Sequence, residues 1–95
     1  MSTRVEVSCR SADDGWVCTA IVIDSSSESR HEVTVSSAER TRLAPEVTAQ
    51  QLVEESFHFL LEREPKEAIL RQFAISEIER YFPDYKAIIG DRLPT

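Results

Sequence analysis

Residues 16–23 (WVCTAIVI) constrain the fold more than any other segment, because they are apolar at every position except Thr19. A strand with one solvated face would carry a polar residue at every second position. A short apolar run rich in β-branched side chains is instead typical of a strand with both faces covered and both edges paired. The run therefore predicts a β-sheet with residues 16–23 at its centre, covered on both faces.

Residues 4–10 (RVEVSCR) supply one neighbouring strand. They alternate between apolar and polar side chains, which is the pattern of a half-buried strand. The turn at residues 12–15 (ADDG) contains Asp-Gly, a pair that favours positive φ. A four-residue loop there places Cys9 opposite Cys18 and gathers the apolar residues on one face, whereas a one-residue slip would separate them.

Residues 31–35 (HEVTV) alternate in the same way and follow a polar connection over residues 24–29. Three sequential strands with short connections predict an antiparallel meander in the order 1-2-3. We expect the strand at 31–35 to leave an exposed edge, which could pair with a second copy of the chain. Because three strands alone are marginally stable, their apolar face needs a cover.

The second half of the sequence supplies that cover. Thr48 and Gln51 have the spacing of a capping box, and apolar residues recur at helical spacing after them, which predicts a helix over residues 49–63. Ser36 or Ser37 is expected to cap an earlier, shorter helix. We expect the shorter helices, one in each range, over residues 37–43, 65–73, 77–82 and 84–89.

Three local signals set the bounds of these short helices. Pro65 suits a first helical turn, Ser76 with Glu79 forms a second capping box, and Gly90 suits the position after a helix. The predicted fold class is therefore α+β. We expect a single domain over residues 1–95, in which one long and two or three short helices pack on a three-stranded meander.

The composition limits the classes of partner and the cellular compartment that we expect for this protein. The formal net charge is −6 and both halves are acidic, which disfavours binding to nucleic acid. No stretch approaches the roughly 18 apolar residues of a membrane span, and the start lacks the apolar core of a signal peptide. We therefore expect a cytoplasmic protein with reduced thiols that binds no nucleic acid and no membrane.

The chemically reactive residues form no catalytic, cofactor or metal motif. Cys9 and Cys18 on adjacent strands could oxidise reversibly or supply a nucleophile, but no neighbouring base is present, so we expect them to act as small core residues. Glu54 and His58 could supply two metal ligands one turn apart, but no further ligand has suitable spacing, which favours a solvated helix face. The acidic residues single out no pair, and no glycine-rich phosphate loop exists. We expect no cofactor and no catalytic activity.

Six of the seven aromatic residues lie between Phe57 and Tyr85. Phe57 falls on the apolar stripe of the long helix, whereas Phe59 falls off it, and the segment YFPDY places three rings within five residues. Such rings either anchor a partner at an interface or fill the space between short helices and a sheet. Both alternatives stay open, and the candidate interaction surface is Phe59, Tyr81, Phe82 and Tyr85.

The stretch from Phe57 to Tyr85 contains the run FLLEREP followed by a YFP segment. In these features it resembles a family of small bacterial proteins of unassigned function. The strands followed by Thr48-x-x-x-Leu52 and a long helix are similar to the HicB-like antitoxin domain. The first resemblance implies a bacterial protein and names no activity, the second implies a regulatory role, and neither assigns functional residues.

Three classes of function follow from these observations. The favoured one is a non-catalytic module that binds a protein partner or associates with itself, because the sheet is marginal and no catalytic set is present. A small-ligand-binding or catalytic domain would need a pocket between the sheet and the helices on which at least two of its reactive side chains converge. Those candidates are Cys9, Cys18, His58 and Tyr85. An antitoxin-like regulatory domain is the third class and rests on analogy.

Overall fold

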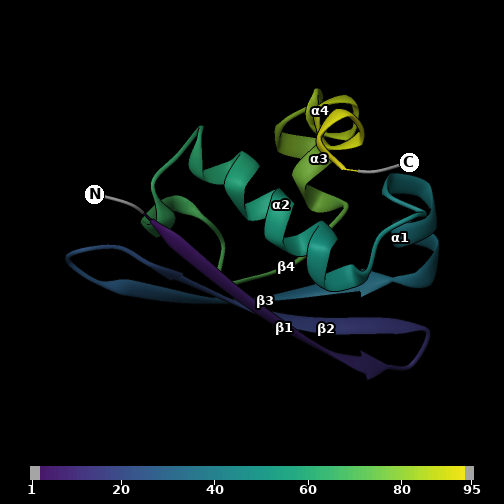
Figure 1. The fold of residues 1–95 in the computed structure, drawn as a ribbon, viewed down its shortest axis with the longest axis horizontal. Coiled ribbons are helices and arrows are strands. Elements are labelled where there is room, and N and C mark those ends of the chain that lie inside the picture. Colours follow the sequence, from purple (N-terminus) through teal and green to yellow (C-terminus); the bar gives the residue numbers. More distant parts are fainter. Residues whose placement is uncertain (1–2, 94–95) are drawn as a thin grey trace.

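The computed structural model describes residues 3–93 and shows a mixed four-stranded sheet with helices on one face (Figure 1). The elements in chain order are β1 (Arg4–Ala12), β2 (Gly15–Ile23), β3 (Glu28–Ser36), α1 (Ser37–Leu43), α2 (Ala49–Leu61), the 3-10 turn η1 (Lys66–Ala68), β4 (Gln72–Ala74), α3 (Glu77–Tyr81) and α4 (Tyr85–Arg92). The fold is α+β, as predicted. Residues 1, 2, 94 and 95 of the predicted domain lie outside the described residues.

The first three strands form the predicted antiparallel meander, with β2 between β1 and β3. Cys9 lies opposite Cys18, so the predicted register is confirmed. Each strand has nine residues, more than the predicted ranges 4–10, 16–23 and 31–35, because pairing continues up to short connections. Asp13 rather than Gly15 has the positive φ, at 46°.

Gly15 is required for space rather than for an unusual φ. It is paired with Ser36 on β3, and a Cβ atom at position 15 would lie 2.1 Å from the carbonyl oxygen of Val35. The neighbouring turn is held to the start of α1, because the backbone N–H and the hydroxyl of Ser37 both donate to the Asp14 carbonyl, at 2.8 and 2.7 Å. The backbone of the β1–β2 turn therefore packs directly against the backbone where β3 passes into α1.

The core lies between the helices and the inner face of the sheet. Helix α2 packs across β1 and β2, and it begins at the predicted capping box, in which Thr48 and Gln51 each bond the other's backbone N–H. The helix ends at Leu61 rather than at residue 63, and Glu62 and Arg63 form a turn. The helix cannot continue through Glu64 without strain, because the residue before a proline disfavours helical backbone. The buried residues of α2 are Ala49, Leu52, Val53, Ser56, Phe57, Phe59 and Leu60.

The predicted helix over residues 65–73 is wrong. Only the single turn η1 forms, and the chain then enters β4, which pairs in parallel with β3. The N–H of Glu32 donates to the carbonyl of Arg71 at 2.8 Å, and the N–H of Ile75 donates to the carbonyl of Thr34 at 2.9 Å. The edge of β3 that we expected to be exposed is therefore covered at its centre.

The second predicted capping box is also wrong. Ser76 has helical backbone angles and its side chain caps nothing. Contacts with α1 hold α3 in place instead: the N–H of Ser76 donates to Glu39 at 3.3 Å, and Arg42 forms two bonds with Glu79, at 3.0 and 2.7 Å. A five-residue helix has little stability of its own, so these tertiary contacts determine its position.

The last two helices also differ from their predicted bounds of 77–82 and 84–89. Helix α3 ends at Tyr81, two residues before Pro83, and α4 continues to Arg92. Gly90 lies inside α4 rather than after it. No helix within residues 3–93 has the length and apolar character needed to cross a membrane.

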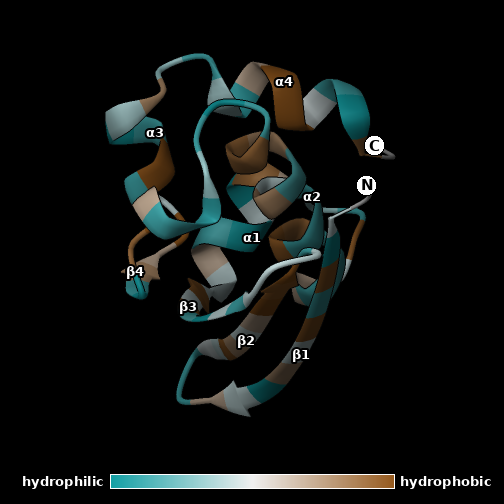
Figure 2. Cartoon of the chain, turned by 90° about the vertical axis from the view of Figure 1, so that its left-hand side faces the viewer, coloured by the Kyte–Doolittle hydropathy of each residue, from teal (hydrophilic) through white to brown (hydrophobic). Residues whose placement is uncertain are grey.

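Within residues 3–93, no helix lies on the outer face of the sheet (Figure 1), so the predicted cover on both faces of residues 16–23 is wrong. Val17, Ile21 and Ile23 are half-buried and point to this outer face, whereas Cys18, Ala20 and Val22 point into the core. Figure 2 shows the related alternation along β1, where hydrophobic and hydrophilic residues succeed one another. The central strand is therefore apolar on a face that the chain itself leaves uncovered.

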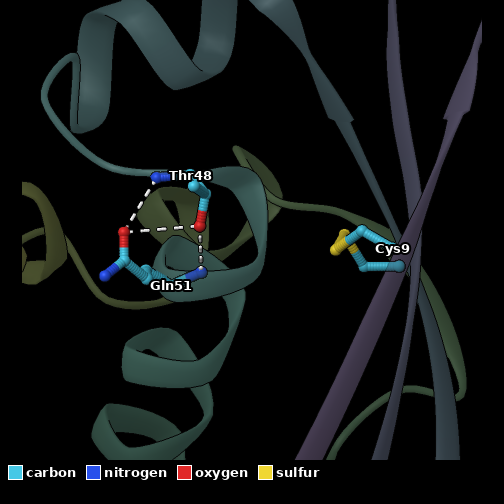
Figure 3. The surroundings of a disulfide bond; sticks show 4 residues. Cys9, Thr48 and Gln51 are labelled. Atoms are coloured by element: carbon cyan, nitrogen blue, oxygen red, sulfur yellow. Dashed lines mark hydrogen bonds between the residues drawn. A yellow bond between two sulfur atoms is a disulfide. The ribbon is translucent and has the colours of Figure 1, made fainter.

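Cys9 and Cys18 are joined by a disulfide bond, so the expectation of reduced thiols is wrong for this structure. The bond projects from β1 and β2 toward the first turn of α2, near Thr48 and Gln51 (Figure 3). Cys18 is fully buried and Cys9 packs against the core. The predicted role of these residues as core side chains is therefore confirmed, with a covalent link added.

We expect Gly15→Ala to destabilise the protein by roughly 1–3 kcal/mol, because the added methyl group overlaps the β3 backbone. Gly90→Ala is the matched control: an added Cβ there meets nothing within 4 Å, so its better helix propensity should stabilise by about 0.5–1 kcal/mol. Urea unfolding followed by circular dichroism measures both. A Gly15→Ala protein as stable as the parent would contradict the close approach.

Candidate interaction groove

An apolar groove of about 390 Å³ opens where the end of α2, η1, β4 and α3 meet. Its floor is formed by Leu60, Ile69, Phe73 and Ile78, all of which are buried. Because these residues also belong to the core cluster, the groove is an open extension of the core. We call this feature the α3–β4 groove.

Two large apolar side chains protrude at the α3–β4 groove. Leu70 is 51% exposed and Tyr81 is 68% exposed, and they are the only large hydrophobic residues within residues 3–93 with such exposure. The position of Leu70 is held by the buried His31, whose Nδ1 donates to the Leu70 carbonyl at 2.8 Å. The other ring nitrogen lies 2.8 Å from the Ser29 hydroxyl, so both nitrogens have a partner.

The α3–β4 groove also contains two carboxylates, Glu64 and Glu77. Glu77 accepts a hydrogen bond from the backbone N–H of Ala74 at 2.9 Å, which occupies a donor on the free edge of β4. This bond blunts the edge against an added strand. The carboxylate of Glu64 bonds no other described residue, so it is available to a cationic partner group.

The structure divides the four predicted interaction residues into two sets. Phe59 and Tyr85 are fully buried, with their ring centroids 5.2 Å apart and edge to face, so they are core. Tyr81 and the half-buried Phe82 line the α3–β4 groove. Phe59 is buried, although it falls off the predicted apolar stripe, because α4 and the Arg63 guanidinium, 3.8 Å from its ring centroid, cover this side of α2.

The Tyr85 hydroxyl is buried and has one partner. It lies 2.6 Å from Ser56 Oγ, and that hydroxyl itself donates to the Leu52 carbonyl, also at 2.6 Å. The Tyr85 hydroxyl is therefore the donor in the pair. Burial raises the pKa of Tyr85 above its ordinary value, so this group stays protonated.

The four side chains proposed for a small-ligand site do not converge. Cys9 and Cys18 are bonded to each other, His58 is exposed and Tyr85 is buried. None of the four lines the α3–β4 groove. Residues 3–93 also contain no group of three or more His, Cys, Asp or Glu side chains that could hold a metal ion.

A smaller hollow of about 230 Å³ lies beside Lys66. The Lys66 ammonium is buried and already has two carboxylate partners, Asp24 at 2.6 Å and Glu67 at 2.7 Å. Asp24 also accepts the backbone N–H groups of Ser26 and Ser27. The bond from Lys66, supported by these N–H groups, holds the pKa of Asp24 far below its usual value. The cation is therefore used to anchor the β2–β3 connection to η1.

Comparisons with models of protein families, with curated proteins and with solved structures gave no match for this chain. The resemblances drawn from the sequence therefore stay predictions. Sequence reasoning also missed Ile69 and Leu70 as groove residues, because both fall inside the range predicted as a helix. Leu70 directly follows Ile69 and precedes Arg71, and so short an apolar run has no period that would have placed it at a groove.

The Ser56–Tyr85 pair predicts an asymmetric response to mutation. Tyr85→Phe should cost about 1 kcal/mol, because Ser56 keeps its bond to Leu52, whereas Ser56→Ala leaves the buried phenol without a partner and should cost more, up to about 3 kcal/mol. The double variant should be more stable than Ser56→Ala alone. Chemical denaturation of the three variants tests this, and equal losses in both single variants would contradict it.

The Asp24–Lys66 pair predicts a pH-dependent stability. Because the folded pKa of Asp24 is depressed, its contribution is present above the unfolded pKa of about 3.9 and is lost as the pH falls toward the folded pKa. Asp24→Asn should therefore be less stable than the parent at pH 7, and the difference should shrink below about pH 4. Urea unfolding across pH 7 to 2 measures it.

In a Lys66→Met background, Asp24→Asn should have a smaller effect at neutral pH, because its main ionic partner is absent. A stability difference of Asp24→Asn that is independent of pH, or unchanged by Lys66→Met, would show that the ion pair does not carry the effect.

Proposed function

We propose that this protein is a non-catalytic interaction module that binds a short segment of a protein partner in the α3–β4 groove. The observation that carries the proposal is the gathering of both strongly exposed large apolar residues, Leu70 and Tyr81, at one apolar groove. Exposed apolar groups rimming a hollow are typical of sites that anchor one or two partner side chains.

The charge of the groove specifies the partner further. Glu64 and Glu77 line it and the whole chain carries a net charge of −6. A complementary segment has an aliphatic or aromatic anchor flanked by Lys or Arg, because opposite charges speed encounter and exclude wrong partners. The blunted edge of β4 favours recognition through side chains over addition of a strand.

A displayed library of random short peptides, selected against the purified protein, tests the proposal. Enriched peptides should share an apolar anchor with adjacent basic residues. Their synthetic versions should bind Leu70→Lys at least about tenfold more weakly than the parent, since that change removes an exposed apolar contact and places a cation beside the basic flank. Glu64→Gln should weaken binding by a smaller factor.

The exposed residue Lys86 on α4 lies outside the groove, so Lys86→Ser is the control and should bind as the parent does. Failure to enrich any peptide with an apolar anchor, or equal binding by the parent and Leu70→Lys, would contradict the proposal.

A further inference from the structure

The uncovered face of the sheet carries an apolar strip along β2. Val17, Ile21 and Ile23 are half-buried there, yet none of them belongs to the core cluster or packs against it. All helices lie on the opposite face (Figure 1). A central strand that is apolar on both faces normally has both faces covered. We therefore expect a cover over this strip, and residues 3–93 supply none.

The charges beside the strip follow a regular order. Glu6 on β1, Ile21 on β2 and Arg30 on β3 lie side by side in one row, so the isoleucine has a negative neighbour on one side and a positive neighbour on the other. The next row repeats this arrangement with the signs reversed, in Arg4, Ile23 and Glu28. Within residues 3–93, Arg30 has no ion-pair partner, and Glu6 pairs only with Arg4, at 3.1 Å, where both side chains are largely exposed.

We propose that a second copy of this chain covers the strip, related to the first by a two-fold axis parallel to β2. This rotation keeps each row in place and exchanges its ends, so β1 of one copy lies over β3 of the other. Glu6 then faces Arg30 of the partner subunit, and the same pair forms again by symmetry. Ile21 and Ile23 lie over their own counterparts, which buries the strip on both copies.

The positions of the charged residues favour a two-fold axis parallel to β2 over an axis that runs across the strands. A two-fold axis across the strands at Ile21 would place β1 over β1, so Glu6 would face its own counterpart and Arg30 would do the same. Like charges that face each other across an interface are unfavourable. The axis parallel to β2 places no like charges opposite each other in the two rows. Two sheets can pack face to face in this way with their strands nearly aligned.

The expected dimer is weak. Three nine-residue strands present a face of roughly 30 by 15 Å, or on the order of 900 Å² for two copies. That area is below the roughly 1,200 Å² of a standard stable interface, so we expect a Kd on the order of 100 μM. The α3–β4 groove uses none of these outer-face residues, so this inference does not rest on the proposed function.

Complementary charge reversal tests the dimer by sedimentation velocity at concentrations that bracket this Kd. In Glu6→Arg, position 6 and Arg30 are both positive, and in Arg30→Glu, position 30 and Glu6 are both negative. Each variant alone should therefore associate at least about tenfold more weakly than the parent. An equimolar mixture of the two should associate as strongly as the parent, because every facing pair is then opposite in charge.

Ile21→Lys is the control: it should be monomeric, and mixing with either charge variant should restore nothing. All three variants should keep the parent's circular dichroism spectrum, because the changed side chains lie on the outer face. A parent that stays monomeric throughout would overturn the proposal, and so would variants that dimerise undiminished or a mixture no stronger than its components.

Discussion

A single layer of helices packs on one face of the sheet, and this contact buries the hydrophobic core of the protein. The central strand β2 has apolar side chains on both faces, but α2 and its neighbours reach only the inner one. Inside, this contact buries a continuous core that includes Val22, Val33 and Phe57. Outside, it leaves an apolar strip between charged strands, and at the end of the helical layer it leaves the α3–β4 groove. Both proposed interaction surfaces are therefore consequences of the same incomplete cover.

Polar contacts between distant segments hold the short elements of this layer in place. Arg42 with Glu79 joins α1 to α3, and Lys66 with Asp24 joins η1 to the β2–β3 connection. Arg92 reaches back to Glu62 near the end of α2, at 2.6 Å. Elements of three to eight residues have little intrinsic stability, so their positions follow from these pairs and from apolar burial.

Sequence reasoning succeeded where the signal was local. Alternation placed the three long strands, and gathering the apolar residues on one face gave the Cys9–Cys18 register. The Thr48–Gln51 capping box located the start of α2. In each case the deciding residues are close together in sequence, or the two-residue period leaves only one arrangement that buries them.

Sequence reasoning failed where partners from far along the chain decide the structure. Strand β4 has three residues, too few to show a period, and it forms because β3 offers an unpaired edge. Phe59 was placed off the apolar stripe, but α4 and Arg63 cover it. The disulfide was the less favoured alternative because the compartment was inferred from the absence of a signal peptide, although the predicted register already placed its two cysteines opposite each other.

The described helices cover one face of the sheet, and we propose that a second copy of the chain covers the other. Methyl NMR with a soluble paramagnetic probe tests this most directly. In dilute protein the outer methyl groups of Ile21 and Ile23 should be broadened by the probe while the inner Val22 and Val33 are not, and rising protein concentration should protect the two isoleucines. Isoleucine methyls that are protected at every concentration, or that stay equally accessible at every concentration, would contradict the account.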